Sequence, residues 1–189
     1  MKVVHEECGY NLYNLITKDV RTYDDKSMED LKSIVKMLAK GDKFYFEFSR
    51  EDFFAEDEDL IKYRNQIPEY FKQNGQYIVK YNVSQRQVRS IGYLPINEDT
   101  YNEILILWKY FETVVFFIPS STLSWEDFDK KFIRKKPEVS VIDFIRKKYT
   151  NSLFAKGYNG DNLAFIYGED YDEAIVKDVI SVLSLDLLE

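Results

Sequence analysis

The sequence is poor in the residue types that usually carry catalysis, metal binding or disulfide bonds. Its 189 residues include one cysteine, Cys8, and one histidine, His5. A single cysteine excludes an intramolecular disulfide framework and is typical of a reducing compartment. The run His5-Glu6-Glu7-Cys8 has metal-ligand residue types, but adjacent residues cannot all face one ion as closed zinc sites require. We therefore expect no metal and no cofactor.

Recognisable catalytic motifs are also lacking. The sequence contains no GxGxxG, no P-loop and no nucleophile elbow around a serine. A serine nucleophile needs a base, and His5 is the only histidine available. A pairing of Cys8 with His5 would have the right chemistry but no supporting pattern. We therefore predict that the protein has no catalytic residues and is not an enzyme.

Long apolar runs are the third thing that the sequence lacks. Its first ten residues, MKVVHEECGY, hold no apolar stretch of signal-peptide length. No segment approaches the roughly 20 apolar residues of a membrane span. We therefore expect a cytoplasmic protein that does not bind membranes. The length suits one α/β domain over residues 1–189, with residues 1–26 the hardest to assign.

Aromatic and β-branched residues are abundant, and they are densest in one stretch. The chain has 15 tyrosines and 14 phenylalanines, and Val114–Ile118 is a continuous apolar run closed by Pro119. A half-buried strand would alternate apolar and polar residues, whereas a continuous run indicates that both faces are covered. Val114–Ile118 is therefore predicted to be the central strand of a parallel sheet.

Four segments share a plan of helix, short break, strand and polar turn. Their predicted strands are Phe44–Phe48, Gln76–Val83, Val114–Ile118 and Leu163–Tyr167. Strands that alternate with helices favour parallel pairing with right-handed crossovers. The fold class predicted from this plan is α/β, a mostly parallel sheet of about four to five strands with helices on both faces.

Three helix starts carry capping signals, and one helix contains a proline. Ser27 and Asn97 precede apolar stripes at helical spacing, and Ser124 with Asp127 resembles a capping box. Pro68 is expected to kink or split the helix that contains Leu60, Ile67 and Phe71. A closing helix is expected over residues 171–185.

Two further segments are harder to read. Leu12, Leu15 and Ile16 favour a short helix, and the stripe from Val139 to Leu153 favours a helix followed by a loop. The Asn-Gly pair at residues 159–160 keeps a hairpin open for Ser152–Tyr167.

Polar residues follow each predicted strand. In a parallel sheet, residues 49–52, 84–86, 120–122 and 168–170 would share one edge, where such folds bind ligands. An alternative function is therefore a small enzyme that holds an anionic metabolite with Arg50 or Arg86 and uses Glu51, Asp52 or Asp170 as base. Polar turns are also expected simply because they cap helices.

An acidic run is the least ordinary surface feature. Six carboxylates fall within nine residues and flank two phenylalanines: Glu51, Asp52, Phe53, Phe54, Glu56, Asp57, Glu58 and Asp59. One interpretation is a solvated helix start, where acids gain from the helix dipole. The other is a docking surface for a basic protein, with the phenylalanines as buried anchors. The spacing does not fit a calcium-binding EF-hand loop.

Charge over the whole chain decides which partners are favoured. The net charge is −7, which disfavours general nucleic-acid binding, so the basic residues between Lys130 and Lys148 are expected to form a solvated face. An acidic protein without catalytic motifs fits a partner that is itself basic. The hypothesis is an immunity- or antitoxin-type protein that neutralises a basic toxin, such as a nuclease, by imitating phosphate.

Overall fold

The structure is a computed structural model. It describes residues 2–7, 11–16, 25–49, 58–82, 87–111, 114–132, 141–156, 162–184 and 186–188. Side chains of residues 2–7, 11–16, 25, 49, 58–60, 64, 80–82, 87, 131–132, 141–142, 162 and 186–188 lie outside this description. No helix in these ranges is both long enough and apolar enough to span a membrane.

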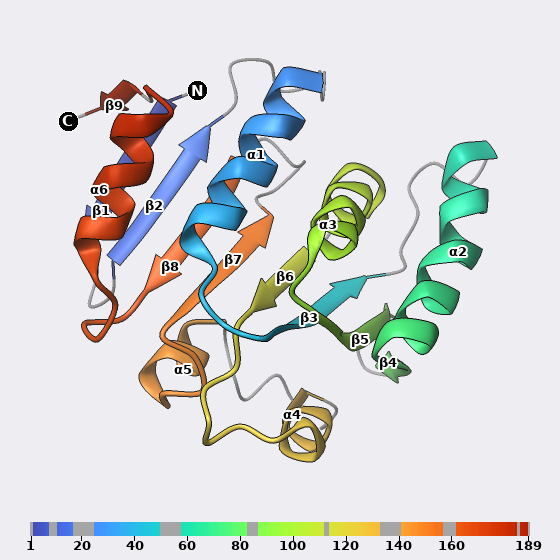
Figure 1. Cartoon of the computed structure of the whole chain (residues 1–189). Coiled ribbons are helices and arrows are strands. Elements are labelled where there is room, and N and C mark those ends of the chain that lie inside the picture. The colour runs from blue at the N-terminus through green and yellow to red at the C-terminus, as the bar shows by residue number, and fades with distance from the viewer. Residues whose placement is uncertain are drawn as a thin grey trace.

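The described strands form one sheet in the order β4-β5-β3-β6-β7-β8-β2-β1-β9 (Figure 1). Their bounds are β1 Lys2–Glu7, β2 Asn11–Ile16, β3 Lys43–Ser49, β4 Gln76–Asn82, β5 Gln87–Pro95, β6 Val114–Phe117, β7 Ser152–Lys156, β8 Asn162–Tyr167 and β9 Asp186–Leu188. The predicted central position of residues 114–118 is confirmed, because β6 lies between β3 and β7 and all four of its residues are buried.

The predicted direction of the strands is wrong. Every described pair from β4 to β1 is antiparallel, and only β1 and β9 run parallel. The fold is mixed α/β, but the sheet is not mostly parallel. A continuous apolar strand shows only that both faces are covered, and helices on both faces of an antiparallel sheet satisfy that condition equally.

Antiparallel pairing also separates the polar turns that a parallel sheet would have placed together at one end of its strands, where we predicted the alternative enzyme site. Because β3 and β6 run in opposite directions, the residues after β3 and β4 leave one edge of the sheet. The residues after β6 and β8 leave the opposite edge. Arg50 and Asp170, which the enzyme alternative would have combined, therefore follow strands that end at opposite edges.

Two hairpins replace segments that we assigned differently. β5 occupies residues 87–95, for which we predicted no strand, and it pairs with both β3 and β4. The favoured helix across residues 139–153 is present only over Val141–Arg146 and does not continue to Leu153. Ser152–Lys156 is β7 and pairs with β8, so the hairpin alternative describes this region correctly. Residues 11–16 form β2 rather than a short helix.

In the described part of the chain, six helices cover the two faces of the sheet (Figure 1). Their bounds are α1 Asp25–Leu38, α2 Glu58–Asn74, α3 Glu98–Tyr110, α4 Trp125–Phe132, α5 Val141–Arg146 and α6 Glu173–Val182. α1, α2, α3 and α6 share one core with one face, and α4 and α5 share a second core with the other. Pro68 lies inside α2, which continues through it as one helix, so of the kink or split that we expected, the split is wrong.

Strand alternation sends neighbouring side chains to opposite cores. On β3, Phe44, Phe46 and Phe48 belong to the first core, whereas Tyr45 belongs to the second. Because both faces of the strand are covered, the segment has almost no polar position. The exception is Glu47, which is 7% exposed and forms an ion pair with Arg89 of β5.

Stacked aromatic rings connect the three central strands. Phe116 of β6 stacks on Phe154 of β7, with ring centroids 4.8 Å apart and an interplanar angle of 11°. On its other side, Phe116 lies 5.7 Å from Phe46 of β3, at 27°. Phe44 meets it edge-on at 5.4 Å. We call Phe46, Phe116 and Phe154 the aromatic stack.

The capping signals that the sequence suggested are present at two helices. The Asn97 side chain accepts a hydrogen bond from the Thr100 amide at 2.8 Å. The Ser124 hydroxyl accepts one from the Asp127 amide at 3.1 Å and donates one to the Asp127 carboxylate at 3.0 Å. These two caps fix where α3 and α4 begin.

Phe116→Ala should reduce the free energy of unfolding by about 3–5 kcal/mol, because it removes a fully buried ring that contacts three others. A denaturant titration measures the loss. Ile61→Ala is the control, because this α2 side chain is 46% exposed, and it should change stability by less than about 0.5 kcal/mol. A loss below about 1 kcal/mol for Phe116→Ala would contradict the central position of the stack.

Gly75→Ala should destabilise the turn between α2 and β4. A Cβ atom at Gly75 would lie 1.9 Å from the Tyr93 carbonyl oxygen of β5. Backbone must move to accept it, at a cost of about 1–3 kcal/mol in a denaturant titration. Gln73→Ala, at an exposed position two residues earlier, should be nearly neutral. Equal stability of Gly75→Ala and wild type would show that β4 does not approach β5 as described.

Candidate protein-binding surface

The predicted docking residues fall mostly outside the described part of the chain. Residues 51–57 lie there, so Glu51, Asp52, Phe53, Phe54, Glu56 and Asp57 are not placed. Glu58 and Asp59 are the first two residues of α2, and their side chains are not described. The predicted docking role of the acidic run therefore stays a prediction. The nearest described surface is that of α2, the helix into which the acidic run leads.

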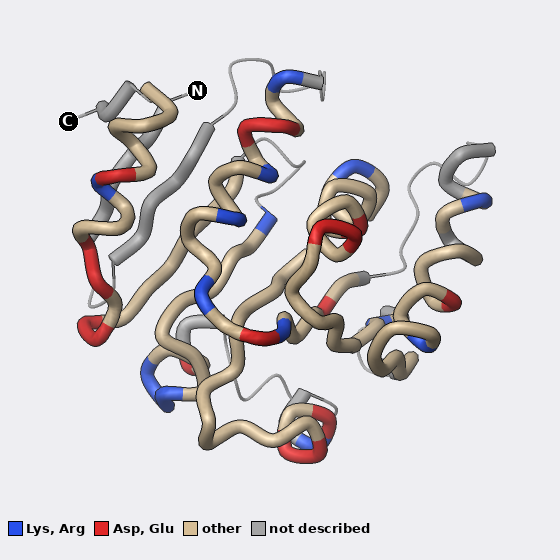
Figure 2. Tube along the Cα trace, viewed as in Figure 1, with Lys and Arg blue, Asp and Glu red and all other residues tan. Residues whose placement is uncertain are grey.

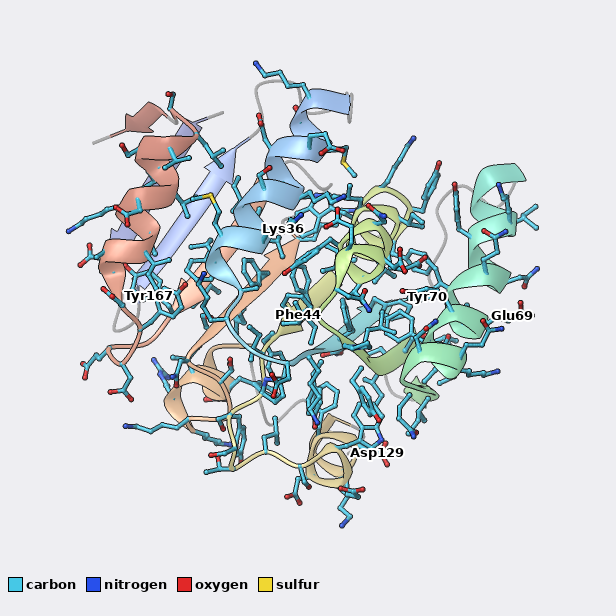
Figure 3. The ribbon with its side chains drawn as sticks, in the orientation of Figure 1. Lys36, Phe44, Glu69, Tyr70, Asp129 and Tyr167 are labelled. Atoms are coloured by element: carbon cyan, nitrogen blue, oxygen red, sulfur yellow. The ribbon has the colours of Figure 1, made fainter. Side chains whose placement is uncertain are left out.

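α2 and α3 pack against each other in opposite directions. Tyr63, early in α2, meets Tyr110 at the end of α3 with ring centroids 4.7 Å apart. Tyr70, one turn before the end of α2, hydrogen-bonds with Thr100 in the first turn of α3. Figure 3 shows Tyr70 directed from α2 toward α3, and Glu69 on the outer side of α2. We call this contact, with the carboxylates described next, the α2–α3 seam.

Two carboxylates on α3 face the seam near Tyr70. Asp99 and Glu103 are four residues apart, which places like charges on the same side of a helix. Burial, reinforced by the charge of Asp99, raises the pKa of Glu103 to about 7. Within the described part of the chain, the Glu103 side chain has neither an ion pair nor a hydrogen bond. A half-buried carboxylate of this kind is stabilised only when a cation or a proton reaches it.

The preceding acid on α3 has the opposite environment. Glu98 binds Lys32 and Lys36 of α1 at 2.5 and 2.7 Å. These two partners lower the pKa of Glu98 to about 2. Lys32 also donates a hydrogen bond to Asn102, at 2.8 Å. Glu98 therefore forms ion pairs with two lysines of α1. Asp99 and Glu103, which lie toward α2, have no ion pair with a described cation.

Aromatic and apolar groups lie beside these unpaired acids. Tyr63, Tyr70 and Tyr110 are each half-buried and belong to the margin of the first core. Ile61, one turn from the start of α2, is 46% exposed. Half-buried tyrosines supply large contact areas at low entropic cost, and they are enriched where proteins bind one another. The seam therefore combines negative charge with aromatic surface, which suits a basic protein.

Other charged groups have partners that explain them structurally. Burial raises the pKa of Glu47, but the ion pair with Arg89 opposes this and compensates the buried charge. At the opposite edge of the sheet, Lys148 and Asp170 form an ion pair at 3.0 Å between two exposed side chains. Such exposed pairs contribute little to stability or function.

The described part of the basic segment is exposed, as the sequence predicted, whereas residues 133–140 and the side chain of Lys131 lie outside the described residues. Lys130, Arg146, Lys147 and Lys148 are all exposed. The α5 helix ends before Lys148, which adopts a left-handed backbone with φ of 55°. Its carbonyl accepts a hydrogen bond from the Ser120 hydroxyl at 2.8 Å, which holds the turn in place. Whether this face binds nucleic acid stays a prediction.

The N-terminal residues that resembled metal ligands do not form a described cluster. His5 lies in β1, whose side chains are not described, and Cys8 lies outside the described residues. In the part of the chain that the structure covers, no three histidine, cysteine or acidic residues gather closely enough to hold a metal ion.

Comparison of the chain with protein-family models, curated proteins and solved structures gives no match.

Sequence reasoning missed Asp99 and Glu103. The signal was present, since two acids four residues apart lie on the same side of a helix that begins at a recognised cap. What the sequence could not show is that α2 covers that side of α3, because the burial of Glu103 depends on the tertiary packing of the two helices.

Glu103→Gln should stabilise the protein at high pH. The folded pKa of Glu103, about 7, lies above its ordinary value of 4.5. The favourable contribution of its neutral form is therefore complete below pH 4.5 and is lost as pH rises through 7. Glutamine remains neutral at both pH values. The free energy of unfolding of the variant, relative to that of wild type, should therefore rise by about 1 kcal/mol from pH 4 to pH 8, after allowance for solvent screening of a half-buried group.

Urea titrations at the two pH values measure this gain. Glu69→Gln, which removes an exposed carboxylate from α2, is the matched control and should change stability by less than about 0.5 kcal/mol at both. A Glu103→Gln variant with the same stability advantage at pH 4 and pH 8 would show that the seam does not hold a destabilised carboxylate.

Proposed function

We propose that this chain is a non-catalytic binding protein that receives a basic protein at the α2–α3 seam, and that it acts as an immunity- or antitoxin-type inhibitor. The observation that carries the proposal is the half-buried Glu103 beside Asp99, for which the described residues provide no cation. An arginine or lysine from a partner would supply that charge. The protein would tolerate an unfavourable carboxylate when free because the complex uses it.

The neighbouring features support the same kind of partner. The net charge of −7 attracts a basic protein at low salt, where the Debye length reaches about 30 Å at 0.01 M. The acidic run leads directly into α2, so its last residues, Glu58 and Asp59, begin the helix that forms one side of the seam. Tyr63 and Tyr110 supply the aromatic surface that would be buried around the charge pair.

A toxin that acts on nucleic acid is the partner class with a physical reason to fit. A nuclease carries a positive cleft because its substrate is a polyanion. A surface that presents carboxylates at close spacing satisfies the same cations and excludes the substrate. Inhibition by this route requires no catalytic residue in the inhibitor. It also requires strong dependence on salt, because the association is steered by charge.

The test begins with capture from the native host. Wild-type protein is immobilised, and proteins retained at low salt and released by 0.5 M salt are identified by mass spectrometry. We expect a strongly basic protein. Asp99→Asn/Glu103→Gln should weaken its binding at least about tenfold, since each charge-assisted hydrogen bond is worth roughly 1.5–3 kcal/mol.

A matched control removes two carboxylates elsewhere. Glu169→Gln/Asp178→Asn makes the same change of net charge at exposed positions in and before α6, and it should bind as tightly as wild type. Reversing Glu56, Asp57 and Glu58 to lysine should mainly slow association, and the on-rate of wild type should fall as salt rises. Inhibition of the captured protein's nuclease activity then tests the inhibitor role. Equal affinity of the two double variants would overturn the seam as the binding surface.

A further inference from the structure

β4 is the outermost strand at one end of the sheet. Among the described strands it pairs only with β5, so the other side of its seven residues has no described strand partner. Figure 1 shows β4 and α2 together at this end, far from β9 at the other. Exposed strand edges present unpaired amide and carbonyl groups, and proteins commonly shorten or cover them. β9 is short, with three residues, whereas β4 is not.

The middle of β4 carries an exposed apolar side chain. Val79 is 43% exposed, and within the described residues only Ile61 and Val182 are comparable large apolar side chains. Its neighbours on the strand, Tyr77 and Ile78, are half-buried against the two cores. Val79 is the fourth of seven residues and thus marks the centre of the edge.

We propose that β4 pairs with β4 of a second copy of this chain, antiparallel about a twofold axis at Val79, so that one sheet runs through a dimer. A twofold interface must be complementary to itself. The sequence of β4, QYIVKYN, has this property when it is reversed against itself. The amide residues Gln76 and Asn82 lie opposite each other, Tyr77 lies opposite Tyr81, and Val79 lies opposite Val79.

Charge in this register is also compatible with pairing. Lys80 lies opposite Ile78 of the second copy, so the one charged residue of the strand does not meet its own copy. Directly opposed like charges would destabilise the pair, whereas opposed tyrosines and valines stabilise it. Any register in which Lys80 meets Lys80 loses both advantages. The register centred on Val79 avoids this clash and also pairs Tyr77 with Tyr81 and Val79 with Val79.

The helix that packs beside β4 carries no net charge of its own. α2, which packs beside β4, has three acidic and three basic residues over Glu58–Asn74. Figure 2 shows the two signs interspersed along the described part of this helix. A second copy therefore meets no excess of like charge on α2, although each copy carries a net charge of −7. An unrelated extended peptide would have no reason to match the reversed pattern of QYIVKYN, which favours a second copy.

Size-exclusion chromatography with light scattering tests the dimer. The chain has a mass of 22.6 kDa, and wild type at 0.1 mM should elute at twice that mass. Val79→Lys places two lysines opposite each other and should shift the protein to the monomer. Val182→Lys, the same change at an α6 position that is 67% exposed, should stay dimeric. Monomeric wild type, or a dimer that survives Val79→Lys, overturns the proposal.

Cysteine crosslinking tests the register in variants that keep the edge intact. In a Cys8→Ser background, Val79→Cys should form a disulfide-linked dimer under mild oxidation, because each residue 79 lies opposite its own copy. Gln76→Cys, also exposed on β4, should not, because the two copies of residue 76 lie six residues apart along the strands, about 20 Å. Efficient crosslinking at residue 76, or none at residue 79, overturns the register. Circular dichroism spectra confirm that each variant is folded.

Discussion

The aromatic stack is the interaction on which the rest of the structure depends. Phe46, Phe116 and Phe154 come from three strands that are far apart in sequence, and their rings lie nearly parallel at ring-centroid distances of 4.8 to 5.7 Å. Large rings at adjacent positions bury more apolar area than aliphatic residues, and their offset contacts add to that burial. Helices on the first face pack on this surface, and the antiparallel pairing of β3, β6 and β7 keeps the rings in register.

Much of the element content could be predicted from the sequence, whereas strand direction could not. Strands over residues 44–48, 76–83, 114–118 and 163–167 were recognisable because each is a dense run of β-formers. β5 was missed because its polar residues find partners on other strands: Arg89 pairs with Glu47, and the Ser90 hydroxyl lies 2.9 Å from that of Tyr77. The pattern of apolar residues indicates which faces of a strand are buried, but it does not indicate whether the neighbouring strand runs parallel or antiparallel.

The candidate surface shows the same limit. An acidic run before a helix is visible in sequence, but the carboxylate with the most altered environment, Glu103, lies on a different helix. Its state follows from α2 covering one side of α3, while α1 reaches the other side and pairs Glu98 with two lysines. The same helix therefore carries a satisfied acid and an unsatisfied one, five residues apart. That difference, which only tertiary packing creates, is the reason for assigning a partner to the α2 side.

The measurement that tests this account most directly is the pKa of the Glu103 carboxyl group, obtained by NMR titration of the free protein. Burial against α2 and the charge of Asp99 predict a midpoint near 7, and Asp99→Asn should lower it. Glu98, in the same experiment, should titrate near 2 because Lys32 and Lys36 hold it charged. A Glu103 midpoint near 4.5, unchanged in Asp99→Asn, would contradict the account, because the seam would then hold an ordinary solvated carboxylate that needs no partner.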